Sequence, residues 1–454
     1  MKSRLNKAIK FSLILLVVGF AFSKLQMGAH PVRASRGGPD PSNTDAPALG
    51  SFSAETNCTA CHFGTGNLNA SGGSITLTAP SSYEPGQKYT IQVALSRGSL
   101  VRFGFQVTAL DASGNLAGTF TITDSNRTQL VDGDPFSEYK NRKYVEQTTG
   151  GSAIPSGGTA GSNQWSFDWT APATRIGKIT FYAAGNCTNN NNLQTGDFIY
   201  TTTALVRPSI ASVNAASSDS SNNNASNGGI ISAYGIDLAS STVTASGDAD
   251  PNTPGIQLPS TLGGTTVTVK DSGNVTRTAT LFFVSPNQVN YLLPTGMLNG
   301  AATLTIASSL GTSTGNLTIA NVKPGIFTVN QQGTGYAAAQ IQRVRSGVTL
   351  GFEDVATGSP TAQTAVPIEW KDANDQLYLV LYTTGVRQRS QLSNVLVTVK
   401  GASQQVVYAQ AHDTYAGLDQ INVLLDRSLA GSGDTNVVLT VDGVAANTVK
   451  INFK

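Results

Sequence analysis

Runs in which apolar and polar residues alternate recur along this chain, and they constrain its fold more than any other feature. Examples are "GSITLTA" at 73–79, "QKYTIQVAL" at 87–95 and "TVTVK" at 266–270. Successive side chains of a strand point to opposite faces of the sheet, so an alternation of period two predicts a strand with one buried face. Turn signals rich in Gly, Asn, Asp and Pro separate the runs, without a helical period between them. The pattern predicts an all-β protein.

The N-terminus has the layout of an export signal. "MKSRLNKAIK" at 1–10 is basic, and "FSLILLVVGFAF" at 11–22 is an apolar core too short for a comfortable transmembrane helix. We predict a signal peptide over 1–34, cleaved before Ser35, with an uncleaved membrane anchor as the alternative. Residues 35–56 are rich in Pro, Gly and Ser and lack periodicity, so we expect an extended, weakly ordered lead-in.

The remaining sequence divides into three parts. A series of alternating runs predicts a β-sandwich over 57–207, followed by a low-complexity Ser/Asn stretch. Beyond it, "PNQVNYLLP" at 286–294 returns as "LDQINVLLD" at 418–426, at an offset of about 130 residues. We therefore predict two repeated Ig-like β-sandwiches, over 208–330 and 331–454.

Charge and histidine content exclude several classes of function. Charged residues make up 12% of the chain and the formal net charge is +2, which argues against a nucleic-acid-binding surface. The three histidines lie far apart in the sequence, so we find no constellation for hydrolysis and predict no enzyme. The export signal places the protein in the extracellular space, the periplasm or on the outer cell surface. We expect a protein or cell-surface partner, and membrane attachment only if the N-terminal segment is uncleaved.

One short motif carries chemistry. "CTACH" places Cys58 and Cys61 three positions apart, directly before His62. Thiols at this spacing reach the two vinyl groups of one haem, and the next imidazole then ligates the iron. Chance would give this arrangement on the order of once in 10⁴ sequences of this composition. The motif predicts one haem c, held by thioethers from both cysteines, with His62 as the axial ligand.

Other uses of the motif stay open. Cys58 and Cys61 could form a redox disulfide, although no βαβ setting is predicted around them. A zinc site would need a further ligand such as Cys187, at a spacing unlike that of known zinc ribbons. The motif could also be unloaded. For the second axial position the sequence offers only distant residues, and these are His30, His412, Met27 and Met297.

The first part of the chain resembles the bacterial reelin-type domain, labelled choice-of-anchor V. The resemblance covers about 40–206 and is carried by "CTACHFGTGN", "YEPGQKYTIQVAL", "RFGFQVTALDASGN", "WSFDWTAP" and "GKITFYAAGNCTNNNN". It implies an extracellular β-sandwich with the Cys-x-x-Cys-His segment just ahead of it. Where relatives tend to have His, this chain has Gln147, which removes one distal ligand. Cys187 replaces a small residue, which raises the prospect of a disulfide there.

Residues 208–454 resemble an uncharacterised C-terminal Ig-like β-domain family of proteins exported by soil bacteria. The matching pieces include "GGIISAYGIDLA", "FFVSPNQVNYLLP" and "YAGLDQINVLL". This resemblance implies an extracellular setting and no activity. Two functions follow from the whole sequence. The first is an exported β-protein with one c-type haem, for electron transfer or small-ligand binding. The second is an extracellular adhesion or structural protein without haem or catalysis.

Overall fold

The computed structural model describes residues 35–454, except 63–66, 222 and 247–257. It is almost entirely β, as the alternation predicts, with three short 3-10 helices in the described part: η1 (Cys58–Ala60), η2 (Leu392–Asn394) and η3 (Arg427–Leu429). None of the described helices is long and apolar enough to cross a membrane. The predicted signal peptide over 1–34 lies outside the described residues.

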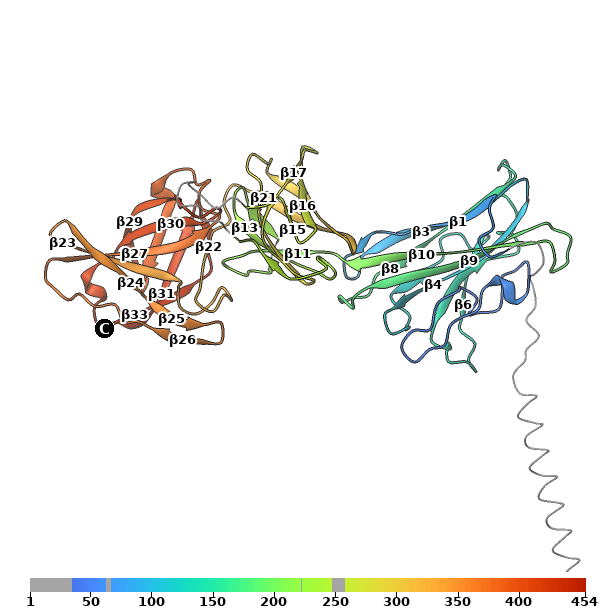
Figure 1. The fold of residues 1–454 in the computed structure, drawn as a ribbon, viewed down its shortest axis with the longest axis horizontal. Coiled ribbons are helices and arrows are strands. Elements are labelled where there is room, and N and C mark those ends of the chain that lie inside the picture. Colours follow the sequence, from blue (N-terminus) through green and yellow to red (C-terminus); the bar gives the residue numbers. More distant parts are fainter. Residues whose placement is uncertain (1–34, 63–66, 222, 247–257) are drawn as a thin grey trace, which may run out of the picture. The chain divides into compact units, whose positions relative to one another are not determined.

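The chain forms two compact units. The first ends at Val206, and the second begins at Arg207 and also includes residues 81–84. The first unit is a sandwich of two antiparallel sheets, shown in blue to green in Figure 1. One sheet has the order β1 (Gly73–Thr78), β3 (Lys88–Arg97), β8 (Ser162–Thr170), β5 (Thr119–Thr121). The other has the order β10 (Phe198–Pro208), β9 (Ile179–Thr188), β4 (Arg102–Asp111), β7 (Lys143–Gln147), β6 (Thr128–Asp132). The last two residues of β10, Arg207 and Pro208, belong to the second unit, where they pair with β2 (Ser82–Tyr83).

Aromatic side chains fill the core between these two sheets. Trp169 and Phe181 are fully buried, and their rings meet edge to face with centroids 5.1 Å apart. Such pairs stabilise a core beyond the apolar area that they bury. The indole nitrogens of Trp165 and Trp169 donate to the carbonyls of Gly151 and Ala117, at 2.9 Å each. The polar ends of the large rings are therefore satisfied inside the sandwich.

The lead-in over 35–56 is packed against the first sandwich, which differs from the weak order expected of it. It carries almost no regular structure, yet Thr44 and Ala46 are buried. Gln106 on β4 accepts a hydrogen bond from the backbone N–H of Asn43 at 2.8 Å. Gly38 has a φ of 112°, and a Cβ there would lie 2.0 Å from Glu146 Oε1, so only glycine allows this approach. Side-chain partners on distant strands thus supply the order that an aperiodic segment lacks.

The second unit contains two further sandwiches. In the first, one sheet has the order β11 (Ala211–Asn214), β13 (Ile230–Tyr234), β19 (Gln288–Leu292), β18 (Thr280–Val284), β14 (Val243–Thr244). Its facing sheet has the order β12 (Asn224–Ser226), β21 (Gly311–Ala320), β20 (Gly300–Ser308), β16 (Thr265–Lys270), β15 (Thr261–Leu262), with β17 (Thr276–Thr278) paired to β16. The core between them runs from Ile210 to Ile319.

In the last sandwich, one long strand serves both sheets. β29 (Ala402–Ala411) pairs with β28 (Val395–Val399) at its start and with β30 (Asp419–Leu424) from Gln405 onward, with a bulge at 406–408. The other strands are β22 (Gly325–Ile326), β23 (Ala339–Arg345), β24 (Val348–Asp354), β27 (Asp375–Thr384), β31 (Gly433–Val441), β32 (Val444–Ala445) and β33 (Val449–Phe453), beside the hairpin of β25 (Ala356–Ser359) and β26 (Ala362–Ala365). Its core runs from Val322 to Phe453.

The repeated Gln-x-Asn segments occupy matching strands, β19 and β30. In β19 the Gln288 side chain donates to Asn290 Oδ1 at 2.8 Å, and in β30 Gln420 donates to Asn422 Oδ1 at 2.8 Å. Residues two apart in a strand share one face, so the two amides satisfy each other there. The repeat therefore reflects a duplicated internal hydrogen bond.

Candidate functional site

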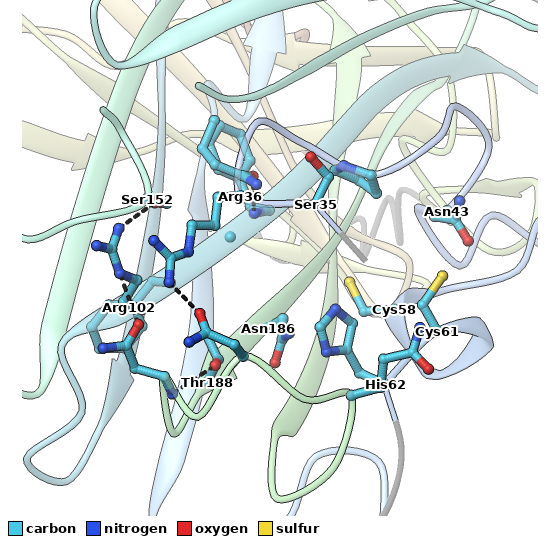
Figure 2. A pocket seen from close by; sticks show the side chains of 18 of the residues that line it. Ser35, Arg36, Asn43, Cys58, Cys61, His62, Arg102, Ser152, Asn186 and Thr188 are labelled. Carbon is cyan, nitrogen blue, oxygen red and sulfur yellow. Dashed lines mark hydrogen bonds between the residues drawn. The ribbon is translucent and has the colours of Figure 1, made fainter. Parts of the chain in front are cut away.

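One cavity of the first unit brings together all three residues of the Cys-x-x-Cys-His motif. Its volume is about 550 Å³, and Cys58, Cys61 and His62 line it (Figure 2). Pockets of this size hold a cofactor or a drug-sized ligand. The rest of the wall comes from the lead-in, the start of β4, the end of β7 and the loop after β9: Ser35, Arg36, Pro39, Asn43, Arg102, Phe103, Gly104, Phe105, Gln147, Ser152, Asn186, Thr188, Asn190, Asn192, Leu193 and Gln194.

A capped turn sets the positions of the two cysteines. Asn57 precedes η1, and its side-chain oxygen accepts from the backbone N–H of Thr59 at 2.9 Å. The Asn57 amide also donates to Asp45 Oδ1 at 2.8 Å, which ties the turn to the lead-in. Cys58 and Cys61 are 8% and 7% exposed and face the same cavity. Both cysteines of the motif therefore lie at one cavity, while their use as haem ligands stays a prediction.

Both thiols of the motif are protonated at neutral pH. Burial raises the pKa of Cys58 to about 12, and the neighbouring Cys61 adds to the effect. Burial also raises the pKa of Cys61. A redox-active Cys-x-x-Cys pair needs a lowered pKa, because the thiolate is the reactive form. The environment of the motif is therefore unlike that of a thiol–disulfide exchange site.

The imidazole of His62 is oriented by a carboxylate from far along the chain. His62 Nδ1 lies 2.6 Å from Oδ2 of Asp197, the residue just before β10. Burial alone would raise the pKa of Asp197, but hydrogen bonds from His62 and from the backbone N–H of Asn189 hold it below its usual value. The carboxylate therefore accepts from Nδ1, which leaves Nε2 as the ring nitrogen that could ligate a metal.

Gln147, at the end of β7, lines the same cavity as His62. It is 3% exposed, and its Oε1 accepts from the backbone N–H of Phe105 at 2.7 Å. A Cβ on Gly104 would lie 3.0 Å from Gln147 Nε2, so the glycine makes room for the amide. The position that the family resemblance singled out is thus part of the site, with an amide donor in place of an imidazole.

Two arginines that the sequence did not reveal as site residues line the cavity. Arg102 begins β4, and it donates from Nε to Asn190 Oδ1 and from Nη1 to Ser152 Oγ, at 3.0 Å each. Arg36 in the lead-in donates to Asn192 Oδ1. Figure 2 shows both guanidinium groups on the side of the cavity away from the cysteines.

The run of asparagines after β9 shapes the loop that holds these arginines. Asn190 and Asn192 have φ values of 60° and 61°, a left-handed conformation that asparagine tolerates better than most residues. Side chains of Asn189 and Asn191 accept from backbone N–H groups two residues ahead, which makes successive Asx turns. The run of asparagines indicates a loop at this place in the sequence, but it does not indicate that the loop contacts Arg36 and Arg102.

One polar atom in the cavity wall lacks a partner. Asn186 on β9 is 7% exposed, and its amide nitrogen faces Asp197 Oδ2 at 3.4 Å. Its Oδ1 makes no hydrogen bond within the described residues. Leaving a buried polar atom unpaired costs about 1–3 kcal/mol. The wall beside His62 is therefore suited to a ligand or water that donates to this oxygen.

The third cysteine, Cys187, is packed in the core of the first sandwich, away from the cavity. Cys187 lies on β9 between Phe103 and Phe198, is fully buried, and does not line the cavity. Burial raises the pKa of its thiol to about 12, and Arg97 opposes the effect. All three cysteines are free thiols, so the disulfide involving Cys187 that the sequence suggested is not formed.

The candidates for a second axial ligand do not line this cavity. His412 and Met297 belong to the second unit, where His412 accepts from the backbone N–H of Thr414 at 3.1 Å and Met297 is part of a sandwich core. His30 and Met27 lie outside the described residues. Within the described residues, no group of three His, Cys, Asp or Glu side chains is placed to hold a metal ion, so the zinc alternative gains no ligand set there.

Comparison with known proteins supports the reelin-type interpretation of the first unit. Residues 56–186 match the Reeler domain family. The matched region begins just before Cys58 and ends at Asn186, so it includes the motif and most of the sandwich. No curated protein matches the chain. Reeler domains occur in extracellular proteins, which agrees with the location expected from the sequence.

Proposed function

We propose that this chain is an exported β-protein that carries one covalent c-type haem in the cavity of its first unit. A single observation supports this most strongly. The two thiols and the imidazole of Cys-x-x-Cys-His line one cavity, with the imidazole already oriented by Asp197. The second unit then serves as a scaffold or contact surface outside the cytoplasm.

The donor set of the cavity fits this group. Each thiol would add across one vinyl double bond, forming a C–S bond while the proton goes to the other vinyl carbon, and no oxidant is consumed. Cys58 and Cys61 would hold the thioethers, and His62 Nε2 would ligate the iron. When bound, the iron supplies one-electron redox chemistry or a site for a small ligand. Asp197 fixes the tautomer of His62 and increases its basicity.

The opposite side of the cavity favours small-ligand binding over electron transfer. The described lining contains no methionine and no histidine besides His62. Haem with one strong protein ligand keeps a position for small molecules, whereas electron carriers usually have two. Gln147 and Asn186 would then supply a hydrogen-bond donor and an acceptor near that position. The alternative, an adhesion or structural protein without haem, leaves the oriented His62 and the orphaned Asn186 oxygen without a role.

The mass of the exported protein tests the proposal directly. Full-length protein co-expressed with the haem-maturation machinery is expected to gain the mass of one haem and to stain for haem after SDS denaturation. The Cys58→Ala/Cys61→Ala variant is expected to lose both signals completely. Cys187→Ala is the matched control, because that thiol does not line the cavity and should leave the signals intact. A colourless wild-type protein with no added mass, after competent maturation of a known substrate, would refute the proposal.

Replacing Asp197 tests the role of the carboxylate beside His62. In the loaded protein, Asp197→Asn is expected to raise the reduction potential by about 60 mV, a tenfold change in the redox equilibrium, because a less basic imidazole stabilises ferric iron less. Potentiometric titration followed by absorbance measures it. Asp168→Asn is a control, since that carboxylate lies on β8 and pairs with Lys88. An unchanged potential in Asp197→Asn would contradict this role.

A further inference from the structure

We propose that Arg36 and Arg102 form a clamp for two carboxylates of the ligand, on the side of the cavity opposite Cys58 and Cys61. This inference rests on the proposed function and extends it, because it assigns a binding site to the carboxylates of the ligand. The two residues are called the arginine clamp below. They come from separate segments, the lead-in and the start of β4, and meet at one cavity.

The charge of the cavity wall supports an anionic ligand. Among the described lining residues there are two arginines and neither aspartate nor glutamate. Asp197, which contacts His62, lies behind the imidazole and does not line the cavity. A cavity with low-dielectric walls and charge of one sign attracts ligands of the opposite sign.

The hydrogen bonds of the clamp leave its charge uncompensated. Arg102 donates to the Asn190 amide and the Ser152 hydroxyl, and Arg36 donates to the Asn192 amide. All of these acceptors are neutral, so within the described residues neither guanidinium pairs with a carboxylate. Guanidinium groups bind carboxylates through strong, charge-assisted hydrogen bonds. The neutral partners orient the two guanidiniums while leaving their charge available.

The strand that carries Arg102 and the contacts next to Arg36 position the two residues. Arg102 lies in the ladder between β4 and β9, opposite Thr188. Arg36 is next to Gly37, whose carbonyl accepts a hydrogen bond from Gln129, and two residues from Gly38, where a Cβ would lie 2.0 Å from Glu146 Oε1. A preorganised clamp loses less entropy on binding than two free surface side chains would.

The polarity of the cavity matches that of haem. The macrocycle carries two vinyl groups at one edge and two propionates at the opposite edge. Figure 2 shows the cysteines and His62 on one side of the cavity and Arg36 and Arg102 on the other. A haem tethered at Cys58 and Cys61 would therefore direct its propionates toward the arginine clamp.

Equilibrium binding of iron mesoporphyrin tests the clamp without covalent attachment. This porphyrin has ethyl groups in place of vinyls, so it cannot form thioethers. Apo full-length protein is titrated with the free diacid and with its dimethyl ester, and absorbance gives both dissociation constants. We expect the diacid to bind about 100-fold more tightly than the ester, because each charge-assisted contact contributes about tenfold.

Variants assign the preference to the two arginines. Arg36→Gln and Arg102→Gln are each expected to reduce the diacid-over-ester ratio by about tenfold, while ester binding stays unchanged. Arg102→Lys keeps the charge without the planar fork and should retain part of the ratio. Lys140→Gln removes an exposed cation that does not line the cavity, and should leave the ratio as in the wild type.

The two proposals fail in different ways. Equal affinity for diacid and ester, a ratio insensitive to both arginine substitutions, or no binding of either compound would overturn the clamp. The covalent haem is judged separately, by the added mass of protein matured with natural haem. Added mass without a diacid preference refutes the clamp alone. A diacid preference without added mass refutes covalent attachment and supports the clamp.

Discussion

Replacing Glu55 by alanine is expected to lower the free energy of unfolding of the first unit by about 3–5 kcal/mol. Glu55 is buried at the end of the lead-in and accepts from Arg142 Nη1 at 2.5 Å and from Tyr144 Oη at 2.7 Å. Thr44 Oγ1 donates to its second oxygen at 2.5 Å. The variant would leave the Arg142 guanidinium, 2% exposed, without its anion. Removing one partner of a buried ion pair costs far more than losing a surface pair.

Tryptophan fluorescence during urea unfolding measures this effect in the full chain. The three tryptophans are Trp165 and Trp169 in the first unit and Trp370 in the second, so a Trp370→Phe background isolates the first unit. Glu138→Ala is the control, because Glu138 is an exposed carboxylate that also contacts the lead-in, through the backbone N–H of Ser53 at 3.2 Å. An effect of Glu55→Ala no larger than that of the control would show that the buried pair does not hold the lead-in.

The second large effect is a loss of stability with rising pH that depends on Glu146. Burial raises the pKa of this carboxyl to about 7, against hydrogen bonds from Gln106 and Gln129 that lower it. Its pKa in the unfolded chain is near 4.5. Between these values the folded state binds more protons, so stability is present at low pH and is lost as pH rises toward 7. From pH 5 to pH 8 the free energy of unfolding should fall by about 2–3 kcal/mol through this group.

Glu146→Gln separates this effect from other titrating groups. The amide cannot ionise, so the difference in unfolding free energy between wild type and variant should shift by about 2–3 kcal/mol in favour of the variant from pH 5 to pH 8. At pH 5 both side chains are neutral in the folded protein, so the variant should be close to the wild type in stability there. A constant difference across this range would contradict the raised pKa.

Sequence periodicity predicted strands well where a strand buries one face, as β1, β3 and β16 do. β1, β3 and β16 coincide closely with the quoted alternating runs. The three residues of the motif at 58–62 line one cavity, since they are local and η1 needs only a capping asparagine to form. Their use as haem ligands stays a prediction. Periodicity and short motifs therefore predict local structure where a residue's partners are close in sequence or where a strand buries one face.

Other parts of the site depend on contacts that no local pattern encodes. Asp197 reaches His62 across 135 positions of sequence, and neither residue type nor spacing marks the pair. The lead-in was expected to be weakly ordered because it lacks periodicity, but polar side chains of β4 and β6 satisfy its backbone. Arg36 could be recognised as a site residue only once that docking was known. Long-range hydrogen bonds thus determine the order of the lead-in and the orientation of His62, and periodicity carries no information about either.

In the proposed haem protein, the burial of the three thiols affects the time between export and attachment of the haem. Compartments outside the cytoplasm are oxidising, and disulfide formation proceeds through the thiolate. Raised pKa values of about 12 at Cys58 and Cys187, and a raised pKa at Cys61, keep that species scarce. A folded chain would therefore oxidise slowly, which would keep both motif cysteines available for the proposed thioethers.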